Sequence, residues 1–136
     1  MAQLQRILIA LASIAVALLL IVVTATSQAA PADAIAAVAP ALPGNKLGIR
    51  ASDLKSMKNP KGTGTFVYVP QTQFQGVERL LVWLVVDGKA FPLNGATKGT
   101  VTPSLPWPRE APKGLWQKTG LDPYSPAEAL RIVFGK

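Results

Sequence analysis

The amino-acid sequence predicts an α+β fold, in which a small antiparallel β-meander carries a capped C-terminal helix and follows an N-terminal apolar signal or anchor helix. Two observations predict this class. An apolar run at residues 79–86 is followed directly by an Asp-Gly dipeptide, which is typical of β-hairpin turns. Residues 125–128 then combine Ser, Pro and Glu in the order that begins a helix. An all-β sandwich or barrel with a terminal helix is the alternative that the pattern leaves open.

Residues 1–29 have the plan of a secretory signal peptide. One basic residue, Arg6, precedes an unbroken apolar run at 7–23, and Ser27 and Ala29 occupy the small-x-small positions of a cleavage site. The run is longer than most signal-peptide cores and close to the length of a membrane-spanning helix. We therefore expect either a cleaved signal peptide or a single retained membrane anchor. Because the positive charge precedes the run, both alternatives place the following chain outside the cytoplasm.

Residues 30–45 are rich in Ala and Pro and carry a single charge. Pro40 and Pro43 exclude a long helix, so this segment is predicted to be a linker or a loose N-terminus. Residues 46–136 are then the candidate domain, which is large enough to be stabilised by a core without disulfides or metals. It holds 13 of the 14 basic and 6 of the 7 acidic residues, so the net charge of +7 belongs to it.

The first elements of this domain are predicted from caps and side-chain alternation. Ser52 is a favourable cap for a short helix over 52–57, and the following Asn-Pro-Lys-Gly at 59–62 is typical of a type I turn. Residues 65–69 are β-branched or aromatic and predict a strand. The run at 79–86 is apolar on both alternating faces, which indicates a central strand covered on each side.

A hairpin turn joins this central strand to a strand at 89–93, which Pro92 restricts to a sheet edge or a bulge. The Asn-Gly dipeptide at 94–95 predicts a second turn, followed by a short extended piece at 100–102. Four prolines within residues 103–112 exclude a helix and a central strand there. This segment, the Pro/Trp strap, is expected to be extended and polyproline-like.

The last predicted element is a helix that runs to about Phe134. Ser125 as N-cap, Pro126 at the first position and Glu128 at the third form a capping box, and Gly135 ends the helix. Helical spacing predicts an apolar face that covers the sheet. Its residues are Ala127, Leu130, Val133 and Phe134.

The sequence contains neither Cys nor His, which excludes disulfides, thiolate nucleophiles, Ser-His-Asp triads and histidine metal sites. We expect no cofactor and no resident metal. Among the carboxylates, Glu78, Glu110 and Asp122 are not explained by a turn or a cap. A pair of carboxylates can support hydrolysis, but their spacing shows no such pair. A small carboxylate-dependent hydrolase is therefore the least favoured function.

The candidate binding surface combines a basic segment with a mixed cationic and aromatic one. The first set is Lys46, Arg50, Lys55, Lys58 and Lys61. The second set is Trp107, Arg109, Lys113, Trp116, Lys118 and Tyr124. Cations beside exposed aromatics suit anionic polymers, lipid head groups or a protein surface. In the alternative interpretation, the tryptophans are buried and hold the strap against the sheet, while the lysines are solvated.

These patterns favour a non-enzymatic interaction or accessory module that is exported or membrane-anchored by its N-terminal segment. We expect its partner to be another protein at or outside the membrane. A binder of anionic polymers or lipid head groups is the alternative, because the domain is strongly basic. Nucleic acid is not expected as a partner of a domain outside the cytoplasm.

Overall fold

The structure is a computed structural model, and it describes residues 31–70, 73–74 and 76–136. The predicted signal or anchor segment at residues 1–29 lies outside this range. In the part of the chain that is described, no helix combines the length and the apolar composition needed to cross a bilayer. Residues 31–136 pack together as one compact unit.

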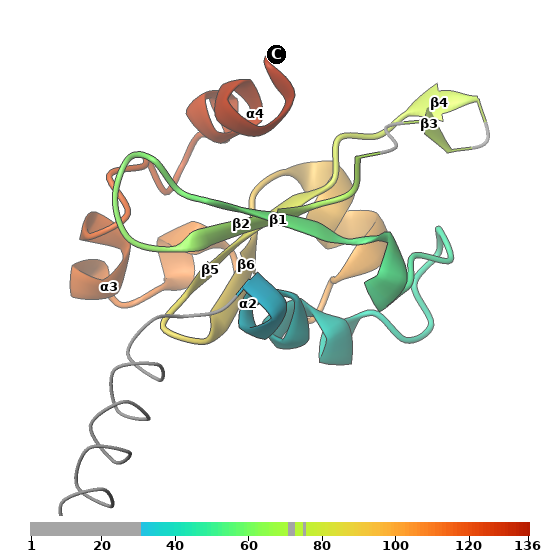
Figure 1. Cartoon of the computed structure of the whole chain (residues 1–136), viewed down its shortest axis with the longest axis horizontal. Helices are drawn as coiled ribbons and strands as arrows, with labels where there is room; N and C mark the ends of the chain where they lie inside the picture. Colours follow the sequence, from blue (N-terminus) through green and yellow to red (C-terminus); the bar gives the residue numbers. More distant parts are fainter. Residues whose placement is uncertain (1–30, 71–72, 75) are drawn as a thin grey trace, which may run out of the picture. The chain divides into compact units, whose positions relative to one another are not determined.

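A four-stranded antiparallel sheet in the order β1-β2-β5-β6 is the centre of this unit (Figure 1). Its strands are β1 (Lys55–Lys58), β2 (Thr65–Tyr68), β5 (Val82–Val86) and β6 (Lys89–Pro92). A separate hairpin of β3 (Gln73–Phe74) and β4 (Val77–Glu78) is inserted between β2 and β5. Together with the helices on both faces, the sheet gives a mixed α+β fold, as predicted.

The central position of β5 confirms the interpretation of the apolar run. β5 lies between β2 and β6, and each of its residues is buried. Because strand side chains alternate, the odd and even positions enter different cores. Val82, Leu84 and Val86 belong to the core on one face, and Trp83 and Val85 belong to the core on the other.

The hairpin between β5 and β6 also has the predicted chemistry. Asp87 has a φ of 50° and Gly88 a φ of 75°, so both turn residues adopt the left-handed region that matches the twist of a two-residue hairpin. β6 is an edge strand, and Pro92 pairs with Trp83 at its end. The prediction of a hairpin leading to a proline-containing edge strand is therefore confirmed.

The segment predicted as a linker is instead a core element. Helix α2 (Pro31–Val38) continues into a 3-10 turn at Ala39–Ala41 and lies against one face of the sheet (Figure 1). Ala34, Val38 and Leu42 are spaced four apart and all are buried. This spacing places them on one side of the helical segment. Burial of this apolar stripe stabilises a helical conformation that the prolines were expected to exclude. The linker prediction is wrong for these residues.

The other face of the sheet is covered by α3 (Lys113–Gln117) and α4 (Ala127–Phe134). Trp116 of α3 and Ala129 of α4 share one core with Phe66 and Phe91 of the sheet. Figure 1 shows α2 and α4 on opposite sides of the strands. Each face of β5 is thus sealed by helical residues, which explains its complete burial.

Two local predictions are wrong because the backbone of these residues finds other hydrogen-bond partners. Residues 52–57 do not form a helix, since only Ala51–Asp53 make a 3-10 turn and the next residues pair with β2 as β1. Residues 100–102 are not extended, because Thr97–Val101 form a π-helical turn. Asn94 caps that turn by accepting a hydrogen bond from Thr97 N at 2.9 Å, so the Asn-Gly dipeptide begins a helix instead of a hairpin.

The start of α4 also differs from the predicted capping box. The cap is Pro126 without a side-chain hydrogen bond, while Ser125 Oγ accepts a 3.3 Å bond from Ala127 N. Ala127 is exposed and Ala129 is buried, so the apolar face begins two residues later than expected. The predicted end is confirmed, since Gly135 has a φ of 75° and its N–H bonds to Arg131 O.

Two loops far apart in sequence are held together in a contact that requires glycine. Asn59 is buried, and its Nδ2 donates to Thr63 O at 2.9 Å and to Thr119 O at 3.0 Å. Thr63 N donates to Lys118 O across the same contact. A Cβ at Gly62 would lie 2.3 Å from Lys118 O, which is backbone and cannot rotate away.

Gly62→Ala is therefore expected to destabilise the protein by roughly 1–3 kcal/mol, the usual cost of overpacking a closed contact. The matched control is Gly114→Ala in α3, where a Cβ would meet no atom within 4 Å. That control is expected to be neutral or to stabilise by up to about 1 kcal/mol, because Ala is the better helix former. Urea unfolding of both variants checks the difference. Equal stability of the two variants would contradict the close approach of the loops.

Candidate functional site

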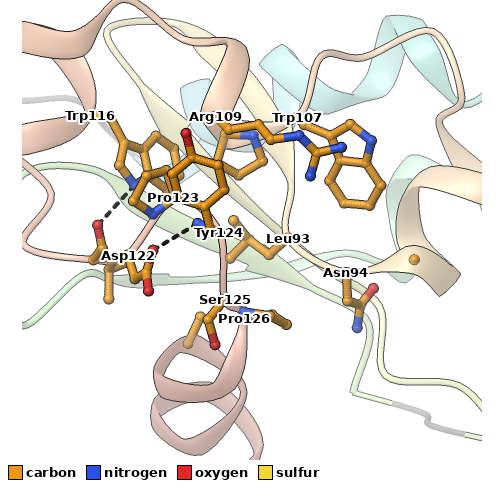
Figure 2. A pocket seen from close by; sticks show the side chains of 14 residues that line it. Leu93, Asn94, Trp107, Arg109, Trp116, Asp122, Pro123, Tyr124, Ser125 and Pro126 are labelled. Carbon is orange, nitrogen blue, oxygen red and sulfur yellow. Dashed lines mark hydrogen bonds between the residues drawn. The ribbon is translucent and has the colours of Figure 1, made fainter.

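A pocket of about 180 Å³ opens where the Pro/Trp strap meets the start of α4 (Figure 2). We call it the strap pocket, and it is lined by residues 93–95, 107–109, 116, 121–126 and 129. Its buried lining consists of apolar side chains from the core that α3 and α4 share, namely Leu93, Trp116, Leu121 and Ala129. The pocket is thus an opening in a packed core, with a floor that the fold itself fixes.

Trp116 fixes the floor through two contacts. Its ring meets Phe91 edge-on, with the ring centroids 5.5 Å apart at 80°. Its indole Nε1 donates a 2.9 Å hydrogen bond to Leu121 O, which ties the segment between α3 and α4 back onto the ring. Thr119 Oγ1 donates to Trp116 O at 2.7 Å and closes the same turn. Trp116 is therefore a structural anchor, and its buried indole N–H is satisfied.

Trp107, which belongs to the Pro/Trp strap, is only half-buried and has cations beside its ring. Arg109 Cζ lies 5.1 Å from the ring centroid and Lys98 Nζ lies 5.6 Å from it. Lys98 Nζ also donates to Pro103 O at 2.9 Å and to Leu105 O at 2.6 Å, which fastens the strap. Figure 2 shows Trp107 and Trp116 on opposite sides of the pocket, with Arg109 extending toward Trp107.

Tyr124 forms the outer wall. Its side chain is 76% exposed and is the large hydrophobic group that the described surface leaves open to water. The local backbone is ordered by an Asx turn, in which Asp122 Oδ1 accepts a 2.8 Å hydrogen bond from Tyr124 N. Pro123 and Pro126 on either side restrict the backbone further. The backbone that carries the exposed ring is therefore held at the edge of the pocket.

The three unassigned carboxylates each have a local role in the structure. Two accept hydrogen bonds from backbone N–H groups two or three residues away, and the third pairs with the terminal lysine. The contacts are Glu78 Oε1 with Lys136 Nζ (2.8 Å), Glu110 Oε2 with Trp107 N (2.6 Å) and Asp122 Oδ1 with Tyr124 N (2.8 Å). Of the described carboxylates, Asp122 alone lines the strap pocket.

The first set of predicted cations is spread over several surfaces. Lys55 and Lys58 stand at the two ends of β1 and are three residues apart, so strand alternation directs their side chains to opposite faces. Lys61 pairs with Glu128, with 2.8 Å between Nζ and Oε1. Lysines at an edge strand also protect it from pairing with another chain, which is a structural reason for Lys55 and Lys58.

The strap pocket brings together part of the second set. Its members there are Trp107, Arg109, Trp116 and Tyr124. Lys113 and Lys118 are exposed on and after α3, and Lys46 and Arg50 are exposed on the loop before β1. The sequence reasoning missed the apolar floor and the role of Asp122. The Asp-Pro-Tyr-Ser-Pro run at 122–126 is a turn signal that could have indicated an ordered Tyr124.

No protein-family model, no curated protein and no solved structure matches this chain. The function is therefore argued from the strap pocket, its exposed aromatic residues and the distribution of charge.

Proposed function

Without a matching family as a guide, we propose that the protein is a non-enzymatic interaction module that binds another protein through the strap pocket. The observation that carries this proposal is the pairing of an exposed aromatic ring with an apolar floor. Tyr124 is held open to water above buried Leu93, Trp116 and Ala129. Tyr, Trp and Arg are the residues that most often dominate binding energy at protein interfaces.

The rigidity of the pocket supports this function. Trp107 is fixed by the contacts of Lys98 with the strap carbonyls, and the Asx turn at Asp122 fixes the backbone at Tyr124. Aromatic side chains that are already ordered lose little entropy when a partner covers them. Nothing in the folding of this unit requires Tyr124 to be aromatic, because the ring is largely outside the core.

We place this activity outside the cytoplasm, because residues 1–29 have the charge and apolar pattern of a signal peptide or single anchor. In the retained form, the module would be an accessory subunit beside the membrane. In the cleaved form, it would be periplasmic or secreted. Either form presents the strap pocket to partners in the same compartment.

Binding of anionic polymers or lipid head groups is the second candidate, and the net charge of +7 supports it. The dependence of affinity on salt concentration distinguishes the two functions, since an electrostatic binder loses affinity steeply as ionic strength rises. A variant with glutamine at all five positions of the first cationic set should then lose binding. The protein-docking proposal expects that variant to keep its partner, because those side chains lie outside the strap pocket.

Site-specific photo-cross-linking in the producing cell tests the proposed function. A benzoylphenylalanine placed at Tyr124 is expected to form a discrete adduct with one protein, because this ring lies at the centre of the proposed interface. The same group at Asp87, in the exposed turn between β5 and β6, is the control and is expected to give no such adduct. Identical adducts at both positions, or none at Tyr124, would contradict the proposal.

A further inference from the structure

We propose that the strap pocket takes an extended, proline-containing peptide that carries an acidic residue beside its proline. This inference rests on the proposed function and names the chemistry of the partner. It follows from the shape of the pocket walls, from which hydrogen-bonding groups are already engaged, and from the position of one cation.

The walls of the pocket suit a proline ring. Trp107 and Tyr124 supply flat aromatic surfaces, and buried Pro108 and the partly exposed Pro123 and Pro126 also line the pocket. Aromatic-lined grooves are the general solution for polyproline II recognition, because that helix is stiff and presents its rings at the surface. The volume of about 180 Å³ fits one or two side chains and is too small for a folded element.

The hydrogen-bonding groups of the pocket favour a ligand that is rich in acceptors and poor in donors. Three side-chain acceptor atoms of the lining already accept hydrogen bonds. Asn94 Oδ1 accepts from Thr97 N and Oγ1, Ser125 Oγ accepts from Ala127 N, and Asp122 Oδ1 accepts from Tyr124 N. The Arg109 guanidinium adds donors and no acceptor, and the Tyr124 hydroxyl adds one more donor.

This balance discriminates between ligand classes. Each proline of the peptide brings a carbonyl acceptor and no N–H group, so the docked segment offers acceptors to these donors, and only its acidic residue brings a backbone N–H. A sugar carries many hydroxyls, each of which brings a donor that needs an acceptor. Because three side-chain acceptors of the lining are already engaged, fewer are left to compensate those hydroxyls for the water that they lose. The peptide is therefore favoured over a neutral glycan.

Arg109 supplies the preference for acid. It lines the pocket, it is exposed, and it makes no ion pair with a described carboxylate, since the described pairs are Lys61–Glu128 and Lys136–Glu78. Its contact with the Trp107 face leaves guanidinium N–H groups available for a carboxylate, which Arg binds in a bidentate manner. Asp122, the described carboxylate that also lines the pocket, lies on the Trp116 side in Figure 2, so a glutamate next to a docked proline would meet Arg109 on the Trp107 side.

The test measures binding of a capped Pro-Pro-Glu-Pro-Pro peptide to the full chain in detergent, with tryptophan fluorescence as the signal. We expect saturable binding that weakens about tenfold when the glutamate becomes glutamine, the effect of losing one charge-assisted hydrogen bond. Arg109→Gln should remove that difference between the two peptides. Arg131→Gln, a matched change at an exposed site of α4 outside the pocket, should preserve it.

Three results would overturn the inference. The first is equal affinity for the acidic and the neutral peptide, and the second is equal affinity for a peptide with alanine in place of every proline. The third is competition by inorganic phosphate at equal concentration, which would indicate a head-group or free-phosphate site. The proposed function survives any of these if Tyr124 still cross-links to a discrete partner, so the two failures are distinguishable.

Discussion

A chain that begins at Lys46 is expected to remain unfolded, whereas a chain that begins at Pro31 is expected to fold cooperatively. The difference is α2 and the turn after it, which bury Ala34, Val38 and Leu42 against the sheet. Each fully buried apolar side chain of the size of Val or Leu contributes about 1.5–3 kcal/mol. Their loss also opens the core around Trp83 to water, so the total approaches the whole stability of a small domain, about 5–15 kcal/mol.

Circular dichroism and urea unfolding of the two truncated chains measure this difference. A chain that begins at Asp33 is a useful intermediate, because it removes only the first two residues of α2 and keeps the buried stripe. It should unfold cooperatively with a modestly lower midpoint. If the chain from Lys46 unfolds at the same urea concentration as the chain from Pro31, residues 31–45 are a linker after all.

Trp116→Ala is expected to destabilise the protein by about 3–5 kcal/mol, the range found when a large aromatic side chain is removed from a core. The change removes the edge-on contact with Phe91 and leaves Leu121 O without its 2.9 Å hydrogen bond from the indole. It also removes the floor of the strap pocket. Stability and the binding site should therefore be lost together.

Two companion variants separate packing from hydrogen bonding. Trp116→Phe keeps an aromatic ring, so its free energy of unfolding should fall by about 1–3 kcal/mol less than that of the alanine variant. It should still be less stable than the original protein, because Phe has no indole N–H and one buried carbonyl stays unpaired. Tyr124→Ala should change stability by less than about 0.5 kcal/mol, since the ring is 76% exposed. Urea midpoints rank the three variants. A larger loss at Tyr124 than at Trp116 would reverse the assignment of floor and outer wall.

The central part of the fold could be predicted because its signals are local. Within a few residues, the sequence predicts β5 from its apolar run, the hairpin turn from Asp-Gly and the edge strand from Pro92. α2 could not be predicted in the same way. Its eight residues contain a single charge, so the usual contrast between polar and apolar faces is weak, and the spacing of Ala34 and Val38 gains meaning only beside a sheet.

The candidate site was predictable in part for the same reason. Cations interleaved with aromatics at 107–124 pointed to a surface, and the structure brings Trp107, Arg109 and Tyr124 to one pocket. The sequence could not separate the roles of Trp107 and Trp116, since both lie among cations in and after the proline-rich segment. Their difference arises from distant partners: Trp116 meets Phe91 of the sheet, whereas Trp107 meets cations. The floor residues come from the helices α3 and α4 and from two loops, and they share no motif.

The strap pocket also links the stability of the fold to binding. Its floor belongs to the core that covers one face of β5, while its outer wall is attached by short-range turns. Substitutions in the wall should therefore change affinity without changing the urea midpoint. Substitutions in the floor should change both, which gives mutational data a simple spatial interpretation.

Fluorine NMR of the full chain labelled with 5-fluorotryptophan tests peptide binding at the strap pocket most directly, because each of the three tryptophans reports a different place. Trp107 lies in the wall of the strap pocket, and Trp83 lies in the core on the opposite face of the sheet. On addition of the Pro-Pro-Glu-Pro-Pro peptide, we expect a saturable shift of the Trp107 signal, identified by its loss in Trp107→Phe, with the Trp83 signal unchanged. An unmoved Trp107 signal at millimolar peptide, or an equal shift of Trp83, would contradict binding at this pocket.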